Sequence, residues 1–142
     1  MTGGMRRALS DQLIRHEGLR LKLYSDSLGV PTIGVGRNLR DKGISHAEAM
    51  LLLDNDLDEV LVDLQTFPWW AALDPVRQRV LVDLRFNLGP TRFRGFKRML
   101  RKISEQDYPL AAAAMRDSLW YRQVGQRGVR LTRMMVSGMD VP

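Results

Sequence analysis

One short β-hairpin pattern in an otherwise helical chain is the feature that most restricts the possible folds of this sequence. Residues 19–24, LRLKLY, alternate apolar and polar side chains, which is the period of a half-buried strand. Small polar residues and a glycine follow at 25–29, and residues 30–35 predict a return strand that begins beside Pro31. Asp26 therefore lies at the tip of the predicted hairpin.

The segments on either side of the hairpin predict helices. An apolar stripe predicts a first helix over residues 6–17, so that Glu17 is its last residue. Ser45 and Glu48 have the spacing of a capping box, which predicts a second helix over residues 46–66. That helix carries a run of acidic residues on its outer face, and we expect no chemistry from it.

The second half of the chain predicts a group of shorter helices. Asp74 and Pro75 are an N-cap and a first helical residue, and the helix that they begin is predicted to end at Gly89. Further helices are predicted from about Phe96, Tyr108 and Gly128, with breaks at Gly95, Pro109 and Gly125. The predicted fold class is therefore α+β and mostly helical.

Two carboxylates and a hydroxyl, those of Glu17, Asp26 and Thr32, follow one another at spacings of nine and six residues. A glycosidase needs a carboxylic acid that protonates the leaving oxygen and a carboxylate that activates water or attacks the sugar. Each residue also has an ordinary structural explanation. Glu17 can be a solvated helix end, Asp26 a turn-forming residue and Thr32 a residue chosen for its strand propensity.

The spacing of these residues belongs to a longer motif, E-x8-D-x5-T followed by IGVG. Two further blocks follow in order: RFNLGPTRFRGFKRML at 85–100 and SLWYRQVGQRGVR at 118–130. Together the three blocks resemble the phage-type lysozymes, glycoside hydrolase family 24. The resemblance implies a single lysozyme-like domain over residues 1–142, with the substrate cleft between two lobes. Its parts are a hairpin lobe at about 17–44, a linker helix at about 46–66, and a helical lobe at about 74–142 that packs with helix 6–17.

The resemblance also implies roles for the three motif residues. Glu17 corresponds to the general acid, and Asp26 to the carboxylate that positions the attacking water or stabilises positive charge on the sugar. Thr32 corresponds to the hydroxyl that holds that water. An inverting reaction follows from these roles, although retention and a lytic transglycosylase outcome stay open because the sequence does not give the carboxyl separation.

Further residues are matched by the second and third blocks. Phe86 corresponds to an aromatic residue along the cleft, which implies substrate binding, while its apolar neighbours favour a place in the core. Arg127 corresponds to an arginine that the family sets beside its catalytic glutamate, and Arg130 follows one helical turn later, so the pair is expected to brace the cleft. Arg37 replaces a histidine found in many relatives, and a histidine-based ion pair is therefore lost.

Three large aromatic residues are left out of the predicted site. Trp120 is expected in the core, because such large rings usually pack there. Trp69 and Trp70 have no counterpart in the family: if exposed they could contact wall polymer, and if buried they would fix the linker helix.

The implied activity is that of an endolysin-type lysozyme, a muramidase. Such an enzyme cleaves the β-1,4 bond between N-acetylmuramic acid and N-acetylglucosamine in bacterial peptidoglycan, for host cell lysis or wall penetration. The chain has no secretory signal, so we expect synthesis in the host cytoplasm and action on the wall and periplasm after release through a separate holin-like pore. A monomer is expected.

Charge suggests competing interpretations. The net charge is +6, and residues 76–102 hold nine Lys or Arg residues against Asp83 alone. A non-catalytic basic module could bind wall polymer or nucleic acid through this stretch, and a cationic C-terminal segment could perturb membranes. The resemblance favours the enzyme, so no nucleic-acid partner and no stable membrane insertion are expected. With two histidines and no cysteine, neither a metal site nor a cofactor is predicted.

Overall fold

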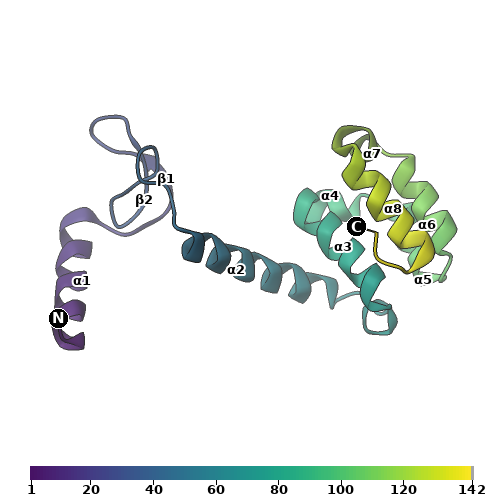
Figure 1. Ribbon diagram of the computed structural model, residues 1–142, viewed down its shortest axis with the longest axis horizontal. Helices are drawn as coiled ribbons and strands as arrows, with labels where there is room; N and C mark the ends of the chain where they lie inside the picture. Colours follow the sequence, from purple (N-terminus) through teal and green to yellow (C-terminus); the bar gives the residue numbers. More distant parts are fainter. Residues whose placement is uncertain (142) are drawn as a thin grey trace. The chain divides into compact units, whose positions relative to one another are not determined.

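The predicted hairpin is present and is extended by a third strand. The computed structural model describes residues 1–141 and divides into two compact units, Met1–Leu51 and Leu52 onward. In the first unit, β1 (Arg20–Ser25) pairs antiparallel with β2 (Pro31–Gly34), which pairs antiparallel with β3 (Arg37–Asn38) (Figure 1). The sequence did not predict β3, because two residues are too few to show an alternation.

The leucines of β1 contradict one part of the strand prediction. Leu19, Leu21 and Leu23 are 56%, 84% and 64% exposed, so this face of the strand is not buried. The helix with an apolar stripe in the same unit, α1 (Gly3–Glu17), buries none of its residues, and it therefore gives the strand no cover. The alternation predicted the strand correctly and its burial incorrectly.

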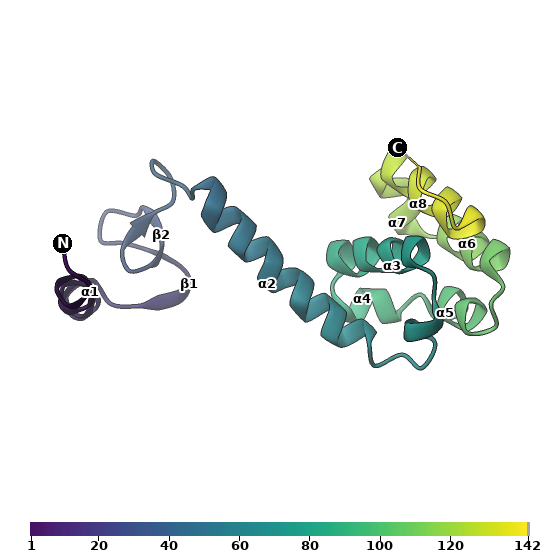
Figure 2. The same ribbon diagram turned by 60° about the horizontal axis from the view of Figure 1, so that its bottom comes forward.

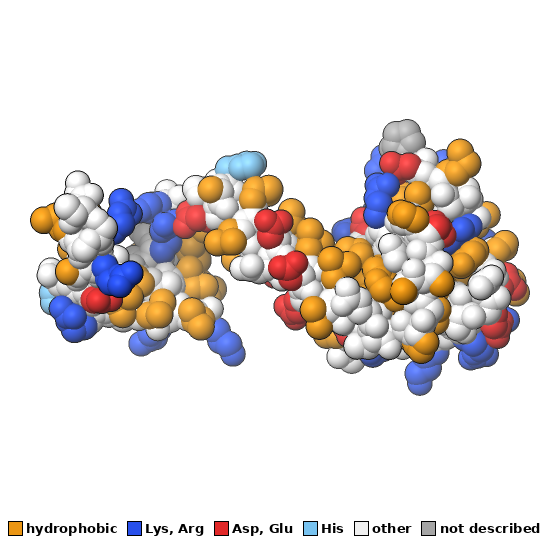
Figure 3. All heavy atoms as spheres, turned by 90° about the horizontal axis from the view of Figure 1, so that it is seen from below, with side chains coloured by type: hydrophobic (Ala, Val, Ile, Leu, Met, Phe, Trp, Pro, Cys, Tyr) orange, Lys and Arg blue, Asp and Glu red, His pale blue; other side chains and the backbone are white. Residues whose placement is uncertain are grey.

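The two long helices begin with the caps that their sequences provide. The Thr2 hydroxyl caps α1 by accepting a hydrogen bond from the Met5 N–H, so this helix starts three residues before its predicted start at residue 6. α2 (His46–Leu64) ends before its predicted end at residue 66, because the N–H groups of Thr66 and Phe67 bond to carbonyls three residues back instead of four. Four of its acidic residues, Asp54, Asp56, Asp58 and Glu59, are exposed, as predicted, whereas Glu48 and Asp63 are partly buried; acidic side chains follow the surface of the helix in Figure 3.

The capping box at the start of α2 is confirmed and also holds an arginine. Glu48 Oε1 accepts hydrogen bonds from the Ser45 N–H and from Arg37 Nη1, each at 2.9 Å, and the Ser45 hydroxyl accepts from the Glu48 N–H at 3.1 Å. Arg37 Nη1 also donates to the Gly43 carbonyl at 3.1 Å. Arg37 thus forms an ion pair of its own where relatives of the resembled family have histidine, and this pair ties β3 to α2.

This network predicts a pH dependence of stability. The hydrogen bond from Arg37, followed by those from Ser45, lowers the pKa of the Glu48 carboxyl from 4.5 to about 2. A lowered pKa in the folded state means that the contribution of Glu48 is complete above the unfolded-state pKa and is lost as the pH falls toward 2. We expect the urea midpoints of wild type and Glu48→Gln to differ at pH 6 and to converge toward pH 2. A difference between the two urea midpoints that does not change with pH would contradict this account.

The second unit contains the end of α2 and six further α-helices within the described residues. They are α3 (Pro75–Leu88), α4 (Pro90–Arg94), α5 (Lys97–Ser104), α6 (Tyr108–Arg116), α7 (Leu119–Val124) and α8 (Gln126–Ser137). A short 3-10 helix, η1 (Trp70–Ala72), precedes α3. In Figures 1 and 2, α6 lies beside α5 and α8, and α3 also packs against α8. The sequence did not predict α4 and α7, because five or six residues show little periodicity.

Two predicted boundaries in this unit were wrong. Pro109 does not break a helix; it lies in the first turn of α6, where the Asp107 side chain accepts a hydrogen bond from the Leu110 N–H at 3.1 Å. α8 begins at Gln126 instead of Gly128, because Gly125, with φ +59°, is the residue at which the chain turns from α7 into α8.

The core of the helical unit includes two of the three tryptophans. Trp120 is 3% exposed and donates its indole N–H to Asn87 Oδ1 at 2.8 Å, which confirms the prediction that it is a core residue. Trp70 is 8% exposed, and Trp69 stacks on Phe67 with ring centroids 4.9 Å apart. The Trp69–Trp70 loop therefore packs against the helical core after α2, as expected if these residues are buried.

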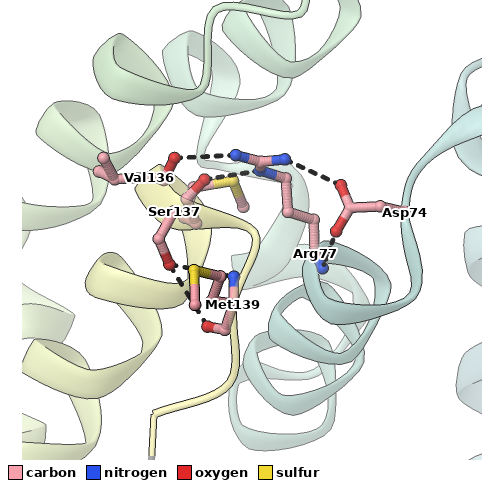
Figure 4. A network of polar contacts seen from close by, with 6 residues as sticks. Asp74, Arg77, Val136, Ser137 and Met139 are labelled. Carbon is pink, nitrogen blue, oxygen red and sulfur yellow. Dashed lines mark hydrogen bonds and ion pairs between the residues drawn. The ribbon is translucent and has the colours of Figure 1, made fainter.

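Arg77 joins three helices of this unit through one guanidinium group (Figure 4). Its Nε and Nη2 donate to the carbonyls of Met135 and Val136 at 2.7 and 2.8 Å, so it caps the last turn of α8. Its Nη1 bonds to Asp74 Oδ1 at 3.0 Å, and the group lies 3.8 Å from the Tyr108 ring centroid. One side chain of α3 thereby fixes α8 and the start of α6.

The fold class is confirmed as α+β and mostly helical, with a small antiparallel sheet before a helical unit. Within residues 1–141, no helix has both the length and the apolar character needed to cross a bilayer.

Candidate active site

Glu17 lies at the point where α1 meets the sheet. The helix ends at Gly18, whose φ of +81° is a conformation that favours glycine. The carboxylate is exposed and lies against Gly36, where a methyl group would come within 3.0 Å of Glu17 Oε2. The second glycine of IGVG is therefore a point of close approach, and its neighbour is the side chain of Glu17.

Asp26 is both a turn-forming residue and an exposed carboxylate. Its Oδ1 accepts hydrogen bonds from the N–H groups of Leu28 and Val30 at 2.8 and 2.9 Å. Its own N–H donates to the Val30 carbonyl at 3.0 Å, which closes the loop between β1 and β2. Oδ2 has no hydrogen bond among the described residues. One carboxylate oxygen thus builds the turn and the other remains available to a ligand.

Thr32 is buried in the middle strand, 3% exposed, opposite Tyr24 on β1 and Asn38 on β3. Its hydroxyl donates to the Val30 carbonyl at 2.8 Å, so toward any other group it can act only as an acceptor. Asp26 and Thr32 are therefore joined through the peptide groups of a single residue, Val30. The Glu17 side chain lies against Gly36, in the turn between β2 and β3 of the same sheet. All three motif residues therefore lie in the first unit.

The other predicted site residues lie together in the helical unit. Phe86, Arg127 and Arg130 line one pocket of about 600 Å³, whose apolar lining comes from α2, α3, α8 and Val141. Phe86 is 43% exposed, so the alternative that it is a core residue is wrong. Arg127 bonds to Asp83, through Nε at 2.8 Å and Nη2 at 2.7 Å, both to Oδ1.

The sequence reasoning missed Asp83 as a site residue and counted it only as the one acid of the basic stretch. A signal was present, because Asp83 precedes Phe86 by three residues in α3 and so lies on the same helical face. Its partner Arg127 is 44 residues away in the sequence. No local pattern identifies a contact of that separation.

The basic stretch at 76–102 is not a continuous free cationic surface. Arg77 caps α8, and Arg85 and Arg94 both bind Asp63 of α2, at 2.6 Å each. Hydrogen bonds from Arg94 and Arg85 lower the pKa of the Asp63 carboxyl to about 2. Arg79, Arg98 and Lys102 form further ion pairs within the unit. Six of the nine cations are therefore engaged, which weakens the case for a module that binds polymer through this stretch.

No group of three or more His, Cys, Asp or Glu side chains within residues 1–141 is arranged to hold a metal ion.

Comparison with known proteins gives a consistent result over most of the chain. The family model described as phage lysozyme matches residues 14–134, which include every candidate site residue. The chain is 37% identical to the endolysin of Salmonella phage P22, over 72% of this chain and 75% of that protein. It is 29% identical to the SAR-endolysin of Escherichia phage Mu, over 97% of this chain and 85% of that protein.

A further relative is much longer. The chain is 31% identical to the pre-baseplate central spike protein of Enterobacteria phage T4, over 92% of this chain. It spans only 28% of the length of that protein.

Proposed function

Because the chain belongs to the phage lysozyme family, we propose that it is an endolysin-type lysozyme that cleaves bacterial peptidoglycan. The bond is the β-1,4 linkage between N-acetylmuramic acid and N-acetylglucosamine. The observation that carries the proposal is the arrangement of the motif residues: Glu17 against Gly36, and Asp26 and Thr32 joined through Val30. An exposed carboxyl at a helix end and a second carboxylate with one free oxygen are the groups that glycoside hydrolysis requires.

In the proposed reaction, Glu17 donates its proton to the glycosidic oxygen as the bond to the anomeric carbon breaks. Asp26 accepts a proton through Oδ2 from the water that attacks that carbon on the opposite face. Thr32, whose hydroxyl hydrogen is held by Val30, accepts a hydrogen bond from the same water. The proton lost by Glu17 is thus balanced by the proton gained by Asp26, and the configuration at the anomeric carbon inverts.

The helical unit contributes the second part of the proposed site. Phe86 presents an exposed ring to a sugar face, and Arg127 and Arg130 brace the cleft from the same pocket. The two units are proposed to act together as one lysozyme-like domain.

The product distinguishes the proposed hydrolysis from the alternative outcomes. Inversion of a β-linkage releases N-acetylmuramic acid first as the α-anomer, retention releases the β-anomer, and a transglycosylase releases an anhydro end without adding water. We expect wild-type enzyme to clear purified sacculi in isotopically labelled water, with one label per new reducing end, and early NMR spectra to show the α-anomer. Heat-denatured protein is the control. Unlabelled anhydro ends would contradict hydrolysis, and clearing by denatured protein would indicate an effect that needs no folded active site.

We also propose a biological setting for this activity. The protein acts on the cell wall as a monomer, in host lysis or in wall penetration. Synthesis takes place in the host cytoplasm, and a separate holin-like pore gives access to the periplasm.

A further inference from the structure

We propose that Asp83 is a positioning residue of this enzyme, which acts by holding the guanidinium of Arg127 in one orientation at the pocket of the helical unit. The inference rests on the proposed function, because Arg127 matters to the reaction only if the pocket forms part of the substrate cleft. It adds to the proposed site a residue that the family motifs did not indicate in this sequence.

The contact itself is a specific one. Nε and Nη2 of Arg127 donate to the same oxygen, Oδ1 of Asp83, at 2.8 and 2.7 Å. Nη2 also lies 3.5 Å from the Asp83 carbonyl oxygen. Two donors on one acceptor fix the plane of the guanidinium as well as its place, and they leave Nη1 for another partner. Both side chains are 41% exposed, so the pair is accessible from the pocket.

The backbone of Arg127 is held independently of its side chain. The next residue is Gly128, where a methyl group would lie 2.9 Å from Cδ2 of Tyr121, so the first turn of α8 lies directly on α7. This approach leaves the backbone little room to move. The remaining freedom of Arg127 is rotation of its side chain, and Asp83 restricts that rotation. Loss of Asp83 is therefore expected to release the guanidinium without moving the helix.

The negative charge of Asp83 also changes the electrostatics of the pocket in the helical unit. Arg127 and Arg130 both line the pocket, and Arg130 forms no ion pair among residues 1–141. Asp83 offsets the charge of Arg127, so the cleft side of α8 presents one uncompensated cation instead of two. Asp83→Asn retains the shape of the side chain and one acceptor oxygen but loses this charge, and with it the charge-assisted strength of both bonds to Arg127. An anionic polymer is then expected to bind at least as well, while the reaction is slower.

The test is a double-mutant cycle on sacculi clearing, with rates measured across substrate concentrations to separate kcat from KM. We expect Asp83→Asn and Arg127→Gln each to lower kcat about tenfold, with KM unchanged or lower for Asp83→Asn. The double variant should be no slower than Arg127→Gln alone, because Asp83 acts through Arg127. The control is Glu105→Gln, which removes a carboxylate from an ion pair with Lys102 on α5 and should leave kcat within twofold.

Additive losses in the double variant would overturn the inference, as would an unchanged kcat in Asp83→Asn or in Arg127→Gln. Melting temperatures measured in parallel identify a purely structural effect: a loss of kcat that is recovered by assaying well below a lowered melting temperature also overturns it. If wild type itself leaves the glycan intact, the proposed function fails together with this inference. An active wild type with an unaffected Asp83→Asn variant rejects the inference alone.

Discussion

Replacement of Glu17 by glutamine is expected to slow peptidoglycan cleavage by about a thousandfold or more, because a general acid typically contributes factors of this size. The amide has the shape of the acid but has no proton to donate to the leaving oxygen. It also fits the space beside Gly36, where a methyl group would lie 3.0 Å from Glu17 Oε2. The variant should therefore fold as wild type does while losing both clearing and new reducing ends.

The matched control for this variant is Asp11→Asn, another exposed carboxylate on α1. It should retain wild-type rates, and circular dichroism should show the same helix content in all three proteins. Full activity in Glu17→Gln would remove Glu17 from the chemistry. Tight pelleting of inactive wild type with the wall would instead favour a binding module.

The largest loss of stability is expected from Asp63→Ala in the helical unit. The Asp63 carboxylate accepts a hydrogen bond from Arg85 Nε at 2.6 Å. It also accepts hydrogen bonds from Nη1 and Nη2 of Arg94, at 2.9 and 2.6 Å. The Arg85 side chain is only 7% exposed, so removal of Asp63 leaves a nearly buried charge without its carboxylate. Breaking a buried ion pair costs about 3–5 kcal/mol, and because the Asp63 side chain is 20% exposed we expect about 3 kcal/mol. That loss corresponds to a melting temperature lower by about 10 °C.

Asp58→Ala is the appropriate comparison, because Asp58 is an exposed carboxylate on the same helix that forms no ion pair within the described residues. Calorimetry of both variants separates the loss of one surface charge from the loss of the Arg85 partner. Equal and small decreases in melting temperature in Asp63→Ala and Asp58→Ala would mean that water replaces Asp63 as the partner of Arg85.

The parts of the fold that could be predicted are those whose cause is local in sequence. The capping box of Ser45 and Glu48 and the N-cap of Asp74 each involve residues three apart, and all appear where expected. The burial of Leu21 could not be predicted correctly, because alternation reports a strand but not whether another element covers it. Short elements such as β3 and α7 contain too few residues for a periodicity.

The candidate site likewise has features that the sequence predicts and features that only the structure shows. Glu17, Asp26 and Thr32 could be identified because they share one motif within sixteen residues of sequence. That Gly36 accommodates Glu17, and that Val30 joins Asp26 to Thr32, required the folded hairpin. Contacts between distant helices leave no pattern in a single sequence.

The position of Arg77 also has a consequence for the order in which the protein acquires its structure during synthesis. The carbonyl groups that it binds belong to residues 58 and 59 positions later in the chain. A ribosome must therefore complete α8 before the guanidinium of α3 meets these partners. Until then the helical unit lacks the bonds that join α3 to α8, so a nascent chain gains this part of its stability only near the end of translation.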